Sequence, residues 1–199
     1  SENGNKEAIS KLGRILADGS QVDNTNFLEE LKWLKLASSN GCREASFMLG
    51  NIYNTGHKIN DTDDSDFFPI INKKEAFNWF KISAEQGMAF GMINVASFLR
   101  LGTGVEQDLK EAFKWYKLAA EQGYADAQLN IGLMYSHGGM GVLRDYNQAY
   151  MWLNIGATNG SAAAKRWRKK VAGKMTSKRI ETAKAMAQKC MKSNYKTCG

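Results

Sequence analysis

Apolar side chains recur along this chain in a pattern that repeats about every 36 residues. Residues 110–146 give the clearest copy, and most of the chain can be laid over it. A shift by 36 residues places Trp115 on Trp79, Ala119 on Ser83, Gly123 on Gly87, Ile131 on Val95 and Gly138 on Gly102. A helical repeat of this kind cannot close its own core and must stack on its neighbours, so the pattern predicts an all-α solenoid.

The repeat divides the chain, and we expect one repeat domain over residues 1–199. It would hold a partial repeat, about four helix pairs and a C-terminal capping helix. That last helix is amphipathic, is expected from Ser177 to about Lys192 with Thr176 as its N-cap, and would cover the exposed end of the stack. The expected bounds are 5–19 for the partial repeat, 28–56, 73–109, 110–146 and 147–173 for the helix pairs, and 174–199 for the capping helix and tail.

Glycine recurs at two places in the repeats. One glycine follows each first helix, where it takes the left-handed backbone conformation at no steric cost. These glycines are Gly41, Gly87, Gly123 and Gly160. Gly50 and Gly132 stand inside second helices, where glycine costs about 1 kcal/mol relative to alanine. We therefore expect two helices to approach closely at Gly50 and at Gly132.

One tryptophan recurs in each repeat, at Trp33, Trp79, Trp115 and Trp152. A row of tryptophans can form a stacking platform for bases or sugars, but one per repeat at a fixed position is more typical of a packing residue. We expect all four to be buried, and each to contribute a few kcal/mol to stability.

An insertion between residues 57 and 71 interrupts the repeat, because Trp33 and Trp79 stand 46 residues apart. Its aspartates superficially resemble a calcium-binding loop; they are Asp61, Asp63, Asp64 and Asp66. Such a loop needs glycine at its sixth place and glutamate at its twelfth. Counted from Asp61, those places hold Asp66 and Asn72. We interpret the segment as a solvated acidic insertion.

The formal charge of +7 is concentrated at the C-terminus, where residues 165–199 hold twelve lysines and arginines and one acid. Basic residues interleaved with Trp167 can bind anionic lipid or acidic polymers by releasing counterions. A solubilising cap is the other interpretation. The absence of a reader motif argues against nucleic acid as a partner. The candidate basic surface consists of Lys165, Arg166, Arg168, Lys169 and Lys170.

The repeat resembles that of the Sel-one-like repeat family, α/α solenoids related to tetratricopeptide proteins. The resemblance lies in Ala112-x-x-Trp115-x-x-x-Ala119-Ala120-Glu121-x-Gly123, in Ala127-x-x-x-Ile131-Gly132-x-x-Tyr135-x-x-Gly138 and in Gly141-Val142-x-x-Asp145-Tyr146. It covers nearly the whole chain and implies a right-handed superhelix of helix pairs that acts as an adaptor for proteins or peptides. A cysteine-rich subset of the family binds penicillin-like compounds and hydrolyses them weakly. The repeats of this chain lack the cysteine pair that marks that subset.

Little in the sequence points to catalysis. His57 and His137 have no cysteine or carboxylate at ligand spacing, so we expect neither a metal site nor a cofactor. No local motif marks a nucleophile. We therefore expect no catalytic residue and a protein that is not an enzyme.

Cys190 and Cys198 are the informative cysteines. The short tail between them could fold back far enough to join them, so we expect a disulfide, with two free thiols as the alternative. Disulfides persist in oxidising compartments, which favours a periplasmic or secreted protein over a cytoplasmic one. No signal peptide is expected at the start of this sequence. No run of about 18 apolar residues predicts a membrane-spanning helix.

The first helices of such a stack are expected to line its concave face. Residues one and four places after the leading alanine of each first helix would then form an apolar ladder along a groove. They are Phe77, Phe80, Phe113, Tyr116, Tyr150 and Leu153. Lys81, Lys114 and Lys117 flank the ladder and favour an acidic partner. The alternative is that the aromatic rings complete the packing around the tryptophans.

The sequence thus predicts a non-enzymatic scaffold that holds a protein or peptide in its concave groove, in bacterial envelope regulation or assembly. The alternative is binding or weak hydrolysis of β-lactams or cell-wall fragments, as in the cysteine-rich relatives. No nucleic acid partner is expected, and a monomer is favoured.

Overall fold

The computed structural model describes residues 27–58, 67–68, 71–138 and 142–198. The predicted partial repeat 5–19 and the four aspartates of the insertion lie outside the described residues. The described helices fall in two compact units, the first ending at Glu106 and the second beginning at Gln107. The single domain over 1–199 stays a prediction.

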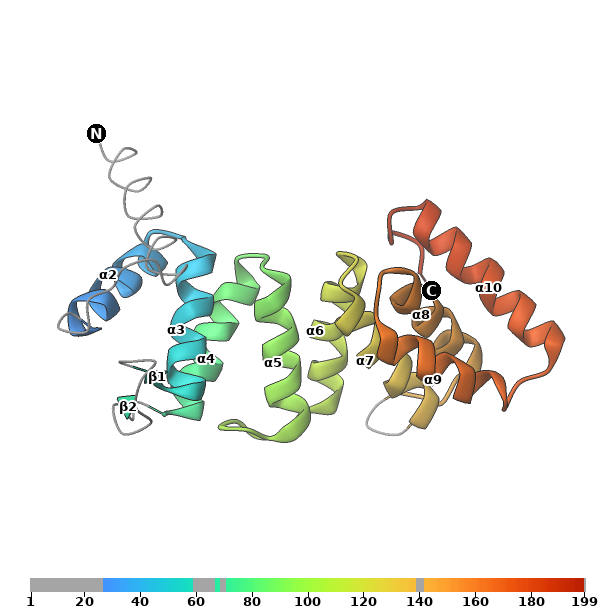
Figure 1. Cartoon of the computed structure of the whole chain (residues 1–199), viewed down its shortest axis with the longest axis horizontal. Coiled ribbons are helices and arrows are strands. Elements are labelled where there is room, and N and C mark those ends of the chain that lie inside the picture. The colour runs from blue at the N-terminus through green and yellow to red at the C-terminus, as the bar shows by residue number, and fades with distance from the viewer. Residues whose placement is uncertain (1–26, 59–66, 69–70, 139–141, 199) are drawn as a thin grey trace. The chain divides into compact units, whose positions relative to one another are not determined.

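The described part of the first unit holds two helix pairs (Figure 1). They are α2 (Phe27–Ser39) with α3 (Arg43–Thr55), and α4 (Lys73–Glu85) with α5 (Ala89–Leu101). Each helix packs on the next along the chain. A two-residue antiparallel ladder, which the sequence did not predict, joins β1 (His57–Lys58) to β2 (Phe67–Phe68), with His57 opposite Phe68. The ladder brings together the two ends of segment 59–66.

Two further pairs and one additional helix make up the second unit. The pairs are α6 (Leu109–Glu121) with α7 (Ala125–His137), and α8 (Tyr146–Thr158) with α9 (Ala162–Ala172). The additional helix, α10 (Ser177–Lys192), packs on α8 and is the predicted capping helix. The all-α solenoid is confirmed, and α10 spans the residues expected for the capping helix.

Side-chain caps fix where the first helices begin. Asp108 accepts a hydrogen bond from the Glu111 amide at 2.9 Å, and Asp145 accepts one from the Asn147 amide at 2.7 Å. Each cap satisfies an amide that has no partner inside the helix. At the other end, the glycines after the first helices have φ of +87°, +87°, +90° and +100°. These values confirm the left-handed conformation predicted for Gly41, Gly87, Gly123 and Gly160.

Close approach of neighbouring helices explains the glycines inside them. A Cβ atom on Gly50 would lie 2.5 Å from Cδ1 of Phe80, and one on Gly132 would lie 2.6 Å from Cγ of Leu153. Phe80 is itself fully buried and held by the rings of Phe47 and Phe98, at centroid distances of 5.7 and 5.5 Å. The second helix therefore has room for a hydrogen atom only at these positions.

The tryptophans do not share one environment. Trp152 is buried, as predicted, and Trp79 and Trp115 are partly buried. The prediction that all four are buried is wrong for Trp33, whose side chain is 39% exposed. The core of α2 is formed instead by Leu31, Leu34 and Ala37, and the indole of Trp33 stands to one side of that stripe.

Candidate functional site

Two of the first helices, α2 and α6, leave large apolar residues open to solvent, fully or in part, at two repeat positions, three and six places after the position of the leading alanine. On α2 these are Trp33 and Leu36, exposed by 39% and 43%. On α6 they are Trp115, which is partly buried, and Leu118, which is 46% exposed. We call Trp115 and Leu118, with the lysines beside them, the open face of α6. Exposed apolar side chains at the same place in separate repeats are typical of an interaction surface.

The predicted aromatic ladder does not form this surface. Phe80, Tyr116 and Tyr150 are buried, so the prediction that they line an open groove is wrong. At about 100° per residue, a side chain four places after the leading alanine stands only about 40° from it around the helix. The alanine faces the core, so the residue four places later faces the core as well. Leu153, at the same position of α8, is also fully buried.

The remaining two aromatic residues of the ladder hold helix pairs together. The rings of Phe77 on α4 and Phe98 on α5 are stacked, with centroids 6.4 Å apart. Phe113 on α6 meets Tyr135 on α7 edge to face, at 5.4 Å. Burial, and next the negative charge of Asp145, raises the pKa of the Tyr135 hydroxyl. These contacts favour the packing interpretation for Phe77 and Phe113.

The three lysines predicted to flank the ladder form ion pairs on the surface of their own helices. Lys81 pairs with Glu85 and Lys117 with Glu121, each at 3.9 Å, across one helical turn. Lys114 donates to Glu111 at 2.7 Å, and this hydrogen bond raises the pKa of its ammonium group. Exposed pairs of this kind stabilise a helix only weakly. The three lysines thus remain available to an acidic partner.

The basic surface on α9 is divided between exposed and structural side chains. Lys165, Arg166 and Lys169 are exposed. Lys170 places its ammonium 4.4 Å from the centroid of the Trp167 ring. Arg168, by contrast, donates to Asn154 of α8 at 2.6 Å and ties α9 to its partner helix. Arg168 is therefore a packing residue rather than part of a free basic surface.

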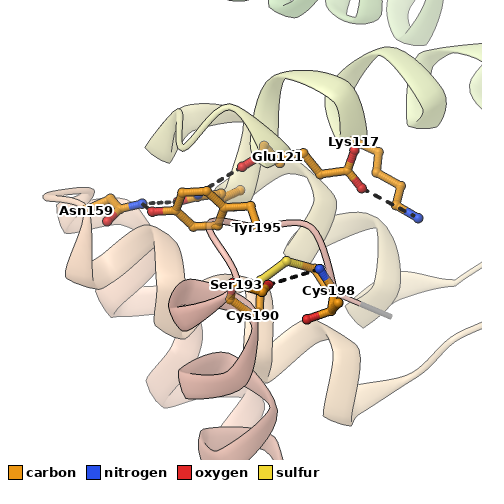
Figure 2. Close-up of a disulfide and its surroundings, with 10 residues drawn as sticks. Lys117, Glu121, Asn159, Cys190, Ser193, Tyr195 and Cys198 are labelled. Atoms are coloured by element: carbon orange, nitrogen blue, oxygen red, sulfur yellow. Dashed lines mark hydrogen bonds and ion pairs between the residues drawn. A yellow bond between two sulfur atoms is a disulfide. The ribbon is translucent and has the colours of Figure 1, made fainter.

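The predicted disulfide is present between Cys190 and Cys198, whose Cα atoms are 4.6 Å apart (Figure 2). It closes a tail in which the Thr197 amide donates to Ser193 Oγ at 3.0 Å. Within that tail Tyr195 accepts a hydrogen bond from Asn159, at the end of α8, at 3.0 Å. The bridge therefore holds the end of α10 against α8.

Reduction of this disulfide should destabilise the second unit by about 2–3 kcal/mol, the loop-closure value for a loop this short. For a chain of this size the melting temperature should fall by roughly 5–10 °C. Thermal melts followed by circular dichroism, with and without reductant, measure the shift. The Cys190→Ser/Cys198→Ser double variant is the control and should melt at the lower temperature in both buffers. Identical melting of the oxidised and reduced wild-type chain would contradict this role.

Helix geometry offers one signal in the sequence for the open face. The position six places after the leading alanine always holds a large aliphatic residue, at Leu36, Ile82, Leu118 and Ile155. Six residues correspond to about 240° around the helix, which turns this position away from the core-facing alanine. A large apolar residue that recurs on the side of the helix opposite the core indicates a second packing surface, which another helix or a partner would cover.

The described part of the chain holds neither a cluster of metal ligands nor a membrane-spanning helix. Among its residues, no three histidine, cysteine, aspartate or glutamate side chains gather as metal ligands would. None of its helices combines the length and the apolar character needed to cross a membrane. Its unpaired cysteine, Cys42, is buried.

Several solved structures are similar to this chain, and two of them illustrate the match. One is a Sel1 repeat protein from Oxalobacter formigenes, with 30% identity and a TM-score of 0.70, covering 82% of this chain and 63% of its own. The other is described as a protective antigen of uropathogenic Escherichia coli strains displaying an SLR fold. It has 25% identity and a TM-score of 0.63, and covers 98% of this chain and 48% of its own. This chain therefore spans roughly half to two thirds of each protein. No curated protein matches it.

The sequence itself matches the Sel1 repeat four times, over residues 6–42, 43–88, 89–124 and 125–161. In this frame each of the three repeats from residue 43 onward starts at the second helix of one pair and ends with the first helix of the next. Helices α9 and α10 lie at or beyond the end of the matched region. Proteins with Sel1 repeats are typically protein–protein interaction scaffolds and are generally non-catalytic. The four matches cover most of its length, and the chain belongs to the Sel1 repeat family.

Proposed function

We propose that this chain is a non-enzymatic scaffold that binds a protein or peptide through the open faces of its first helices. The observation that carries the proposal is the exposure of Trp33, Leu36 and Leu118 at equivalent repeat positions. The cores of α2 and α6 are already complete without these side chains, since Leu34 and Tyr116 fill them. Large apolar and aromatic side chains that the fold does not use are the usual anchors of protein interfaces.

Positive charge along the same helices defines the chemistry of the partner. Lys32 and Lys35 flank Trp33 on α2, and Lys114 and Lys117 flank the open face of α6. Rim charges of one sign steer an oppositely charged partner and disfavour a like-charged one. We therefore propose an acidic protein segment with apolar anchors as the bound species.

An oxidising compartment suits this proposal. The Cys190–Cys198 disulfide holds the tail of α10, and such bonds persist outside the cytoplasm. The two similar structures come from bacteria, and one is described as a protective antigen. We propose a periplasmic or secreted bacterial protein that acts in envelope regulation or assembly.

An affinity capture from the source organism tests the binding surface, with Leu118→Glu compared against Leu143→Glu. Both substitutions add a carboxylate at an exposed leucine, and Leu143, at 90% exposure, lies outside the open face. We expect Leu118→Glu to reduce recovery of the specific partner at least tenfold, because a charge replaces an apolar anchor. Leu143→Glu should recover the partner as the wild type does.

Equal recovery by the two variants would remove the open face of α6 from the proposal. Circular dichroism of both variants shows whether each remains folded, which is expected because neither side chain belongs to the core.

A further inference from the structure

Helix α10 lies along α8 and runs in the same direction. Near the start of both helices, Arg179 Nε donates to Asn147 Oδ1 at 3.0 Å. Beyond the end of both, the Asn159 side chain donates to the Tyr195 hydroxyl at 3.0 Å. Figure 1 shows the two helices side by side within the second unit, and Figure 2 shows the contact at their C-terminal ends.

On α8 the repeat positions that are exposed on α2 and α6 are buried. Met151, Trp152 and Ile155 are exposed by 1%, 1% and 0%. Their counterparts on α4, 73 residues earlier, are Asn78, Trp79 and Ile82, of which Asn78 is exposed and the other two are partly buried. On α6, 37 residues earlier, they are Lys114, Trp115 and Leu118, of which Lys114 and Leu118 are exposed. Helices α7 and α9 pack on α8 as α3 and α5 pack on α4, so α10 is the additional neighbour. The additional burial on α8 therefore belongs to α10.

The side that α10 turns inward is made mostly of small residues, with Ile180 packed beside them near the start of the helix. Ala183, Ala187 and Cys190 recur at intervals of four and three, and all three are fully buried. Small side chains on one helix let it approach the large ones on the other, so that ridges fit into grooves. The packing of α10 on α8 thus shows what kind of element covers this face of a first helix: a parallel amphipathic helix with a stripe of small residues.

Charge distinguishes the face of α6 from the face of α8. At three equivalent positions α8 carries Asn147, Met151 and Asn154, whereas α6 carries Lys110, Lys114 and Lys117. Helix α10 is basic, and its Arg179 meets the neutral Asn147. On α6 the same arginine would meet Lys110, and the like charges would repel. A glutamate at that place would instead be attracted to Lys110.

We infer that the open face of α6 binds an acidic amphipathic α-helix with a stripe of small residues, laid parallel to α6 as α10 lies on α8. The inference rests on the proposed scaffold function and specifies the class of its partner. The apolar anchors Trp115 and Leu118 contact the stripe, and the three lysines pair with the acidic flanks of the bound helix.

Two peptides test the inference on the oxidised full-length chain. The first is residues 176–192 of this protein, acetylated, amidated and carrying Cys190→Ser. The second also carries Lys178→Glu, Arg179→Glu, Lys184→Glu and Lys189→Glu, four exposed positions outside the small-residue stripe, so that its net charge is −4 where that of the first is +4. Fluorescence anisotropy gives the affinity of each, and circular dichroism reports helix formation, because a free peptide of this length is at most marginally helical in water.

The acidic peptide should bind the wild-type chain at least tenfold more tightly than the basic one and become helical on binding. Leu118→Glu should weaken its binding at least tenfold, and Leu143→Glu should leave it unchanged. In the Lys110→Asn/Lys114→Met/Lys117→Asn variant, which carries the side chains of α8 at those three positions, the preference for the acidic peptide should disappear. In NMR spectra of the complex the indole signal of Trp115 should shift, while that of Trp152 should not.

Equal affinity of the two peptides, or binding that survives Leu118→Glu, would overturn the inference. If neither peptide binds while capture of the native partner still depends on Leu118, the scaffold function stands and the helical partner is wrong. If capture is also independent of Leu118, the proposed function fails together with the inference.

Discussion

Replacing Trp152 with alanine should lower the free energy of unfolding by about 3–5 kcal/mol, the usual loss for a large buried aromatic side chain. The same change at Trp33 should cost well under half as much, because 39% of that side chain is already exposed. Both tryptophans occupy the same position of the repeat. The difference therefore measures how far the covering helix α10 has turned a surface position into a core position.

Urea denaturation followed by circular dichroism gives both values. Trp33→Ala is the matched control, because it deletes the same side chain from the same repeat position. Equal losses for the two variants would contradict the assignment of Trp33 to a surface and Trp152 to the core.

Gly50→Ala should destabilise the first unit by about 1–3 kcal/mol, even though alanine is favoured over glycine in a helix by about 1 kcal/mol. The new methyl group would lie 2.5 Å from the ring of Phe80, which Phe47 and Phe98 hold in place. The added carbon must therefore push the two helices apart. Phe80→Leu, which removes the obstructing ring, should make the combined loss smaller than the sum of the two single losses.

Gly173→Ala is the control for this effect. Gly173 has a helical backbone, and the nearest atom to an added Cβ is 3.6 Å away. Alanine there should be neutral or stabilise the chain by up to about 1 kcal/mol. Chemical denaturation of the three single variants and the double variant provides all the values. A stabilised Gly50→Ala would show that the helices do not approach as closely as described.

The repeat pattern alone was enough to predict the helices, their caps and their closing glycines. These features depend on short stretches of chain. An aspartate such as Asp108 caps the start of a first helix, and a glycine such as Gly123 ends it, whichever repeat it stands in. The disulfide was also predicted, because a tail of a few residues can bring Cys198 to Cys190 with little choice of path. Local chemistry sufficed for all of these.

The binding surface was mispredicted because it depends on which way each side chain turns. Phe80 and Tyr116 are aromatic and stand beside a tryptophan, which suggested a ladder along a groove. The helical period places both next to the core-facing alanine and leaves Leu118 outside. The residue types alone do not show which side chains face the core. The angle between their positions around the helix does.

The position of α10 was only partly predictable. Its amphipathic pattern predicted a cap, but Trp152 and Ile155 have the same apolar character as Trp115 and Leu118. Met151 in place of Lys114 is the local sign that the face of α8 is covered. One apolar residue at a position that elsewhere holds lysine or asparagine is a weak signal until the neighbouring helix is known.

Site-specific photo-crosslinking tests the central claim, that partners bind the open face of the first helices. A photoreactive phenylalanine analogue is placed at Leu118, at Leu143 or at Leu101 of the full chain, and the protein is irradiated in cells of its source organism. All three leucines are exposed, so none of the substitutions should disturb the fold. We predict a discrete adduct of defined mass from position 118 and none from the other two. Adducts from positions 143 or 101 without one from 118 would contradict the account.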